Sequence, residues 1–216
     1  MSSDRSPKGI ILTNVRNALI NQTSQPYPQI DSVDSVYKKS EEPLEIQFAN
    51  EFMKLSGKFI FCEDHKELVQ NLQILTQEKQ WNHLFCWEHK LQDLFIKHNF
   101  KNCRIGKNLE KADAGITLCE ALVARTGSIM LSSRQAAGRT LGIFPPVHIV
   151  VAYTQQLVPD IQEAMNIIKD KYEGNLPSMI NLATGPSRTA DIEKTLVLGA
   201  HGPKEVYVFL IDNPDL

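Results

Sequence analysis

The sequence lacks the closely spaced cysteine pairs that hold zinc ribbons and iron–sulfur clusters. It contains four cysteines and no C-x-x-C pattern. Three of the four stand among apolar neighbours, where a free cysteine behaves as a small buried hydrophobic side chain. We therefore expect structural thiols, no metal site and no cofactor in this chain. The cysteines are Cys62, Cys86, Cys103 and Cys119.

The sequence also has little net charge and no long apolar run. A formal charge of −2 and a pI near 6.3 give no reason to expect a nucleic-acid partner. No apolar run approaches the roughly 20 residues that a membrane helix needs. The first ten residues, MSSDRSPKGI, do not contain the apolar core of a signal peptide. We expect a cytoplasmic protein without a membrane span.

Several motifs of well-known sites are absent. The sequence has no G-x-G-x-x-G, no G-x-x-x-x-G-K-[ST] and no G-x-S-x-G. His83, Cys86 and His89 superficially have the spacing of metal ligands. On a strand, however, side chains three positions apart face opposite sides, so these three would not converge on one ion.

What the sequence does contain is an alternation of helical and strand patterns. Short apolar runs at 58–62 and 83–87 alternate with helical patterns at 44–55, 64–79 and 88–98. Such alternation predicts an α/β fold, a mostly parallel sheet with helices on both faces. The continuous apolar run Val147 to Tyr153 predicts a strand in the sheet interior. Further strands are expected at 114–118, 119–124, 128–132, 179–183 and 205–211, with a weak strand at 104–105, a brief helix at 135–141 and a helix opened by Pro159-Asp160.

The first 43 residues differ from the rest. Residues 10–20 have apolar side chains at helical spacing, and residues 21–42 are rich in Ser, Gln, Pro and Asp. This pattern predicts a helical arm and linker at 1–43, followed by one domain at 44–216. The arm packs either on another subunit or on its own domain, and the sequence leaves both open.

The stretch from Ala183 to Pro203, ATGPSRTADIEKTLVLGAHGP, is the most conspicuous in the chain. Gly185-Pro186 imposes a turn, after which Ser187 or Thr189 is placed to cap a short helix. That helix would run to Val197 and end before Gly199, holding His201 on a tight loop between two glycines.

This stretch has the composition of an anion site. Backbone N–H groups at a helix start, hydroxyl groups and the Arg188 guanidinium together suit a carboxylate or a phosphate. The expected ligand-binding residues are Thr184, Gly185, Ser187, Arg188 and Thr189. The alternative is a structural turn in which Arg188 pairs with Asp191. His201 and Asp191 are the candidate catalytic residues; for His201 the alternative is an exposed loop position.

The same stretch carries a family resemblance. T-G-P-S-R-T-A-D-I-E-K followed by G-A-H-G-P-K, with Gly115 to Leu131 and the Pro145-to-His148 entry to the next strand, resembles the lactate-utilisation protein C family, the LUD domain. The resemblance covers Leu44 to Asp212. It implies a fold similar to the glucosamine-6-phosphate isomerase, ribose-5-phosphate isomerase and coenzyme A transferase group. It further implies a role beside iron–sulfur partner proteins in the oxidation of lactate to pyruvate.

Thr126-Gly127-Ser128 is a second turn to which the resemblance assigns a possible site, with Thr126 and Ser128 as ligand-binding residues. Family members often have glutamate directly before this Thr-Gly, where this sequence has Arg125. A transferase nucleophile needs a free carboxylate, which arginine does not provide. The substitution argues against transferase chemistry and adds positive charge suited to an organic acid. As an alternative, the turn is an ordinary hairpin connection.

These observations favour an accessory subunit of lactate oxidation with a small-anion site. Two alternatives remain: a stand-alone isomerase or transferase acting on a phosphorylated or acyl-activated small molecule, and a ligand sensor that uses the same pocket.

Overall fold

The structure is a computed structural model, and it describes residues 6–20, 37, 40–106, 108–192, 195–199 and 201–212. Four helices belong to the α/β domain: α2 (Leu44–Lys54), α3 (His65–Glu78), α4 (His89–Lys97) and α5 (Ile161–Lys171). The strands are β1 (Lys58–Cys62), β2 (Leu84–Cys86), β3 (Cys103–Arg104), β4 (Ala114–Thr117), β5 (Ala121–Val123), β6 (Ser128–Ser132), β7 (Val147–Tyr153), β8 (Leu157–Val158), β9 (Ile180–Ala183), β10 (Arg188–Ile192), β11 (Thr195–Leu198) and β12 (Glu205–Ile211).

The centre of the domain is a six-stranded sheet in the order β1-β12-β7-β4-β2-β3. Every neighbouring pair in it is parallel, so all its strands end at one common edge. Strand β7 lies between β12 and β4, and all seven of its residues are buried. The predicted parallel sheet and the predicted interior position of Val147 to Tyr153 are confirmed.

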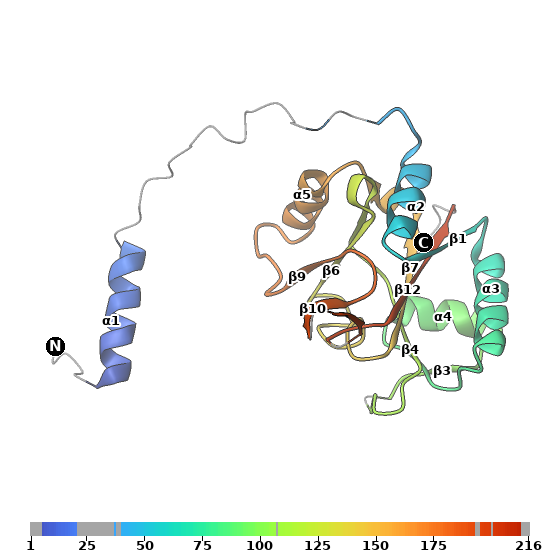
Figure 1. The fold of residues 1–216 in the computed structure, drawn as a ribbon, viewed down its shortest axis with the longest axis horizontal. Helices are drawn as coiled ribbons and strands as arrows, with labels where there is room; N and C mark the ends of the chain where they lie inside the picture. The colour runs from blue at the N-terminus through green and yellow to red at the C-terminus, as the bar shows by residue number, and fades with distance from the viewer. Residues whose placement is uncertain are drawn as a thin grey trace. The chain divides into compact units, whose positions relative to one another are not determined.

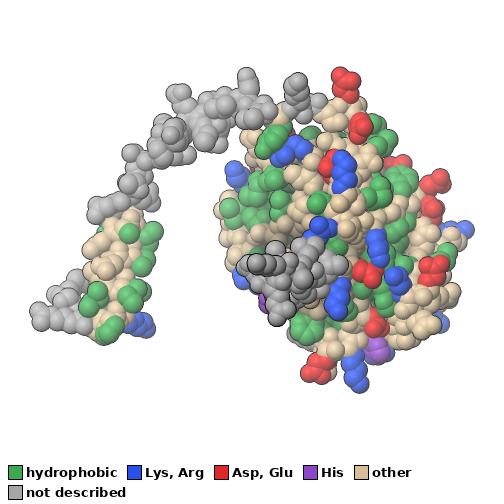
Figure 2. Space-filling model, in the orientation of Figure 1, with side chains coloured by type: hydrophobic (Ala, Val, Ile, Leu, Met, Phe, Trp, Pro, Cys, Tyr) green, Lys and Arg blue, Asp and Glu red, His purple; other side chains and the backbone are tan. Residues whose placement is uncertain are grey.

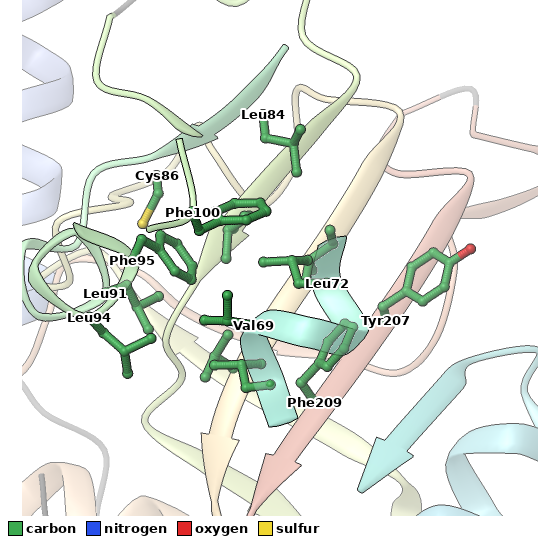
Figure 3. Close-up of a cluster of buried hydrophobic side chains, with 14 of the residues drawn as sticks. Val69, Leu72, Leu84, Cys86, Leu91, Leu94, Phe95, Phe100, Tyr207 and Phe209 are labelled. Atoms are coloured by element: carbon green, nitrogen blue, oxygen red, sulfur yellow. The ribbon is translucent and has the colours of Figure 1, made fainter. Parts of the chain in front are cut away.

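One face of this sheet is covered by α3 and α4 (Figure 1). Side chains from both helices meet those of β2 and β12 in a continuous apolar cluster (Figure 3). The helices fit because their apolar residues recur at helical spacing, as in the Leu68, Val69 and Leu72 stripe of α3. Asp64 caps α3 by accepting a hydrogen bond from the Glu67 backbone N–H at 2.8 Å.

The other face is covered by α2 together with a second, four-stranded sheet in the order β8-β5-β6-β9. Phe48 and Phe52 of α2 pack there against Val150 and Val208 of the main sheet. Helix α5 covers the outer side of the small sheet through Ala164 and Ile168. Helices on both faces are therefore confirmed, with a small sheet sharing the second face.

Two sequence predictions of local structure are wrong. Arg188–Ile192 and Thr195–Leu198 pair as the antiparallel strands β10 and β11 and do not form a capped helix. The stretch is rich in β-branched side chains, which favour strands over helices. Residues 135–141 form successive turns, with Gly138 at a positive φ of 59°, and not a brief helix. A glycine with a left-handed backbone ends a helical turn before it can continue.

Helix α1 (Pro7–Ile20) belongs to a separate compact unit, residues 1–38. It confirms the predicted N-terminal helix. Figure 2 shows hydrophobic side chains along this helix. Its exposed large apolar residues are Ile10, Ile11, Leu12, Val15, Leu19 and Ile20. What this arm packs against stays a prediction. Within the described ranges, no helix combines the length and apolar character that crossing a membrane requires.

Candidate functional site

Three clefts of similar size differ sharply in charge. The first, of about 550 Å³ between α2 and β1, contains Glu45 and Asp212 as its charged residues. The second, of about 520 Å³, is lined by three glutamates and one lysine. The third, of about 580 Å³, is lined by Lys90, Arg134 and Lys171 with one acidic residue, Glu88. Of these three, only the third has the charge to receive an anion.

This third cleft lies at the carboxyl ends of the parallel strands, and we call it the carboxyl-edge cleft. Glu88 follows β2, Leu118 and Cys119 follow β4, and Tyr153 is the last residue of β7. Open α/β sheets bind their ligands outside the carboxyl ends of their strands. The topology therefore places these side chains at the position where such folds carry function.

Glu120 binds two residues that line the cleft, Lys171 and Tyr172. Its side chain is buried and accepts hydrogen bonds from Ser132 Oγ at 2.6 Å and Tyr172 Oη at 2.7 Å. Lys171 Nζ forms an ion pair with its other oxygen at 2.7 Å. Burial raises the pKa of Glu120, but hydrogen bonds from Lys171, Ser132 and Tyr172 outweigh burial and hold that pKa below its ordinary value. Glu120 is thus a fixed anion that holds the end of α5 to the small sheet.

Two cations meet at the ring of Tyr172. The Lys171 ammonium lies 5.5 Å from the ring centroid, and the Arg134 guanidinium lies 5.9 Å from it. The charge of Lys171 is matched by Glu120. Arg134 is exposed on the loop after β6 and carries its charge at the cleft itself. A planar guanidinium beside a ring presents a fork that suits a carboxylate or a phosphate.

Glu88 is the acidic residue in the lining of the cleft. Its exposed fraction is 8%, and one of its oxygens accepts a hydrogen bond from the Ala137 N–H at 3.2 Å. Burial raises the pKa of Glu88, and the nearby Glu120 charge raises it further, while backbone N–H groups offset part of the rise. The pKa of Glu88 in the cleft is thus shifted upward, whereas that of Glu120, which is bonded to Lys171 and Tyr172 of the lining, is shifted downward. Environments that push carboxyl pKa values apart in this way are typical of sites that handle protons.

The Gln156 side chain joins two backbone segments that line the cleft. The Gln156 amide donates to the Cys119 carbonyl at 2.7 Å and accepts from the Tyr153 N–H at 2.9 Å. Burial raises the pKa of Tyr153 to about 12, so its hydroxyl stays protonated at neutral pH. Burial likewise raises the pKa of the Cys119 thiol, which makes it a poor nucleophile.

The sequence-predicted residues lie elsewhere, and the structure brings three of them together. Ser128 Oγ lies 2.7 Å from Thr126 Oγ1 and 2.8 Å from Thr184 Oγ1. These hydroxyls join the turn before β6 to the turn after β9. In both turns a glycine at positive φ allows close approach to α2 and the residues that follow it: a Cβ on Gly127 would lie 2.5 Å from the Phe52 nitrogen, and one on Gly185 would lie 2.8 Å from the Leu55 oxygen.

Arg188 and Ser187 continue this packing arrangement. Arg188 Nη2 donates to the Leu55 carbonyl at 2.6 Å and to Ser56 Oγ at 3.0 Å. The Ser187 N–H donates to the Pro203 carbonyl at 2.9 Å, and the Ser187 carbonyl accepts from the Gly199 N–H at 2.9 Å. The two ends of the predicted site are therefore adjacent. Because residues 188–198 are a hairpin, however, no helix N-terminus supplies donors for an anion here.

We call residues 184–204 the amino-edge segment, because its last residues lead into the start of β12, at the opposite edge of the main sheet. Thr189 pairs with Val197 in the hairpin, and His201 is exposed. The side chain of Asp191 lies outside the described part of the structure. The ligand and catalytic roles assigned to these residues from sequence stay predictions.

Arg125 does not offer a free charge. Its guanidinium forms a bidentate pair with Asp160, at 2.8 and 2.7 Å. Hydrogen bonds from Arg125 hold the pKa of Asp160 below its ordinary value. Asp160 also accepts from the Ile161 N–H at the start of α5, so this pair fixes the helix to the loop before β6.

Sequence reasoning missed Glu88, Arg134, Lys171 and Tyr172. Position was the available signal for Glu88, since it directly follows the predicted strand at 83–87 and opens the next helix. No sequence signal links Lys171 and Tyr172, at the end of α5, to Glu120. Among the described side chains, no group of three or more His, Cys, Asp or Glu is arranged to hold a metal ion. The four cysteines are free thiols, three of them buried.

Residues 46–211 match the family model of the LUD domain. Lactate utilization protein C of Bacillus subtilis (strain 168) is 38% identical over 109 residues, covering 49% of this chain and 45% of that protein. The protein of that name from Macrococcus caseolyticus (strain JCSC5402) is 34% identical over 124 residues, covering 56% of this chain and 53% of that protein. The chain thus spans about half the length of these curated relatives.

A solved structure shares the fold. The crystal structure of a DUF162 family protein from Deinococcus radiodurans superimposes with a TM-score of 0.58, covering 78% of this chain and 96% of that chain. The two sequences are 18% identical, so the likeness concerns the fold alone.

Proposed function

Because the chain belongs to the LUD domain family, we propose that it acts in lactate utilisation as an accessory subunit that works beside iron–sulfur proteins and binds a small organic anion. The observation that carries this proposal is the similarity, at 34–40% identity, to relatives named lactate utilization protein C. Those alignments span only about half of each relative, so the role of the whole relative is extended here to a shorter chain.

Oxidation of lactate to pyruvate removes two electrons and two protons, so it needs an electron acceptor. In this proposal the acceptor belongs to the iron–sulfur partners, and the chain itself carries no cofactor. The cysteine pattern supports this division, because the sequence has no C-x-x-C pair and cluster ligation uses closely spaced cysteines. The task left to this chain is to bind and orient an anion.

The carboxyl-edge cleft supports anion binding. It places Lys90, Arg134 and Lys171 around a space of about 580 Å³, at the sheet edge where α/β folds bind ligands. Charge-assisted hydrogen bonds from a guanidinium are strong in a partly enclosed site, because the surrounding protein screens charge less than bulk water does.

Two experiments test the role. First, the gene is deleted in the native host, and growth on L-lactate as sole carbon source is compared with growth on glucose. We expect loss of growth on lactate alone, restored by the full-length chain; unimpaired growth on lactate would contradict the role. Second, the tagged full chain is purified from lactate-grown cells, followed by mass spectrometry and an iron assay. Iron–sulfur proteins should co-purify, whereas an iron-free chain without such partners would refute the proposed assembly.

A further inference from the structure

We infer that the carboxyl-edge cleft is selective for 2-hydroxy and 2-oxo carboxylic acids, with Arg134 binding the carboxylate and Glu88 contacting the oxygen at carbon 2. This inference rests on the proposed function, since it names the ligand class of that role. It assigns the binding to residues that lie at the opposite sheet edge from the Gly-Pro-Ser-Arg turn.

Arg134 is the residue best placed for the carboxylate. Lys171 already forms an ion pair with Glu120 at 2.7 Å, so a ligand at Lys171 would compete with a buried carboxylate. Arg134 lies over the Tyr172 ring, which orients its guanidinium plane without neutralising its charge. A guanidinium binds a carboxylate through two parallel N–H donors, which fixes the orientation of the acid as well as its position.

Glu88 is bonded to the loop that carries Arg134. The loop after β6 carries Arg134, Gln135 and Ala136 past the cleft, and the next residue, Ala137, donates its N–H to Glu88. One backbone segment thus carries Arg134 and bonds Glu88. In this assignment the carboxylate of the ligand points toward the loop at Arg134, and its second carbon points toward Glu88.

The chemistry of Glu88 suits both oxidation states of such a ligand. A protonated carboxyl group donates a hydrogen bond to the ketone of a 2-oxo acid, and an ionised one accepts from the hydroxyl of a 2-hydroxy acid. An acid without a 2-oxygen would make no hydrogen bond with this buried group beyond those it already has with the loop, and sites that hydrogen-bond a substrate oxygen discriminate against analogues that lack it.

The size and lining of the cleft leave room beyond a three-carbon acid. At about 580 Å³ it is much larger than lactate, and Leu118 and Ala136 give it apolar surface. The assigned selectivity therefore concerns the carboxylate and the 2-oxygen, and not the length of the carbon chain.

The test measures binding to the purified full-length chain by calorimetry and ligand-observed NMR, with pyruvate, L-lactate, propionate and inorganic phosphate as probes. We expect pyruvate and L-lactate to bind at least tenfold more tightly than propionate or phosphate. Arg134→Ala should weaken pyruvate binding at least tenfold. Arg139→Ala is the matched control, because this neighbouring exposed arginine bonds Ser178 outside the cleft and its loss should change binding less than twofold.

Glu88→Ala should abolish the preference for pyruvate over propionate, whereas Glu88→Gln, which keeps a donor, should retain pyruvate binding. Circular dichroism checks that each variant is folded. If Glu88→Ala does not fold, the assignment is still tested by the comparison of pyruvate with propionate and by the two arginine variants. Equal affinity for pyruvate and propionate, or equal effects of Arg134→Ala and Arg139→Ala, would overturn the assignment. The growth experiment is separate: binding without a growth defect refutes the lactate role, and a growth defect without binding refutes this site.

Discussion

The two edges of the six-stranded sheet carry polar side chains in different arrangements. At the carboxyl edge, Arg134, Lys171 and Glu88 surround an open space of about 580 Å³. At the amino edge, the polar groups of the Gly-Pro-Ser-Arg turn contact protein atoms: Arg188 bonds the Leu55 carbonyl, and Thr184 bonds Ser128. The first arrangement leaves charge available to a ligand, whereas in the second the donors already have partners within the fold.

This difference shows that a conspicuous sequence motif can reflect packing requirements. In the amino-edge segment the backbone at Gly185 lies so close to Leu55 that a side chain would clash, and Gly127, in the Thr126-Gly127-Ser128 turn, lies equally close to Phe52 of α2. The cleft residues are ordinary residue types, distributed over five segments that only the fold brings together.

The largest change in stability is expected for a substitution in the Thr126-Gly127-Ser128 turn, which tests whether this turn serves packing. Gly127→Ala places a Cβ 2.5 Å from the Phe52 backbone nitrogen, at a φ of +59°. We expect a loss of about 3 kcal/mol or more in the free energy of unfolding, from backbone strain plus the displacement of α2. Urea denaturation measures this loss.

Gly138→Ala is the matched control for that variant. Gly138 has the same φ of +59° but no atom within 4 Å of its would-be Cβ. Its replacement should cost about 1 kcal/mol, the cost of the left-handed backbone alone. Equal losses in the two variants would show that close approach to α2 is unimportant at Gly127.

The fold was largely predictable, whereas the cleft was not. Apolar periodicity and caps locate α3 and α5, because Asp64 and Asp160 are the residues that satisfy the first N–H groups. The continuous apolar run of β7 indicates its interior position. The hairpin at 188–198 was missed because capping residues and β-branched residues occur in the same stretch. Contacts such as Lys171 with Glu120 join residues far apart in sequence, and no local pattern encodes them.

The next prediction concerns His148, a buried residue near the start of β7. Burial lowers the pKa of His148 from 6.5 to about 4, and its Nε2 lies 2.9 Å from Thr117 Oγ1. The folded chain therefore binds a proton less readily than the unfolded chain. The contribution of neutral, buried His148 to the free energy of unfolding is complete above pH 6.5. It decreases as the pH drops toward 4, by up to roughly 3 kcal/mol.

Urea denaturation between pH 7 and pH 4.5 measures the His148 effect. His148→Gln keeps a polar partner for Thr117 and removes the titration, so its stability should fall less over this range than that of the unmodified chain. Parallel pH dependence in the two proteins would rule out His148 as the cause.

A smaller loss of stability is expected when an ion pair is broken, and the size of this loss should differ between the two edges. Lys171→Met leaves the buried Glu120 without its cation, and we expect a loss of roughly 1–2 kcal/mol, because Lys171 is half exposed. At the amino edge, Lys54→Met breaks an exposed pair with Glu51, which should cost less than about 0.5 kcal/mol. Thermal denaturation in parallel measures both, and equal shifts would contradict the difference drawn between the edges.

A small expected change in stability at Arg188 accompanies the test that decides between the two candidate sites. Arg188→Ala removes hydrogen bonds to the Leu55 carbonyl and Ser56 Oγ on the exposed surface, so the free energy of unfolding should fall by about 1 kcal/mol. If Arg188 serves packing, pyruvate affinity per folded molecule stays within twofold of the unmodified chain, while Arg134→Ala loses at least tenfold. If pyruvate affinity instead collapses in folded Arg188→Ala and survives in Arg134→Ala, the anion binds at the amino edge, as the sequence alone predicted. The pair of variants separates the two edges because each arginine lies at only one of them.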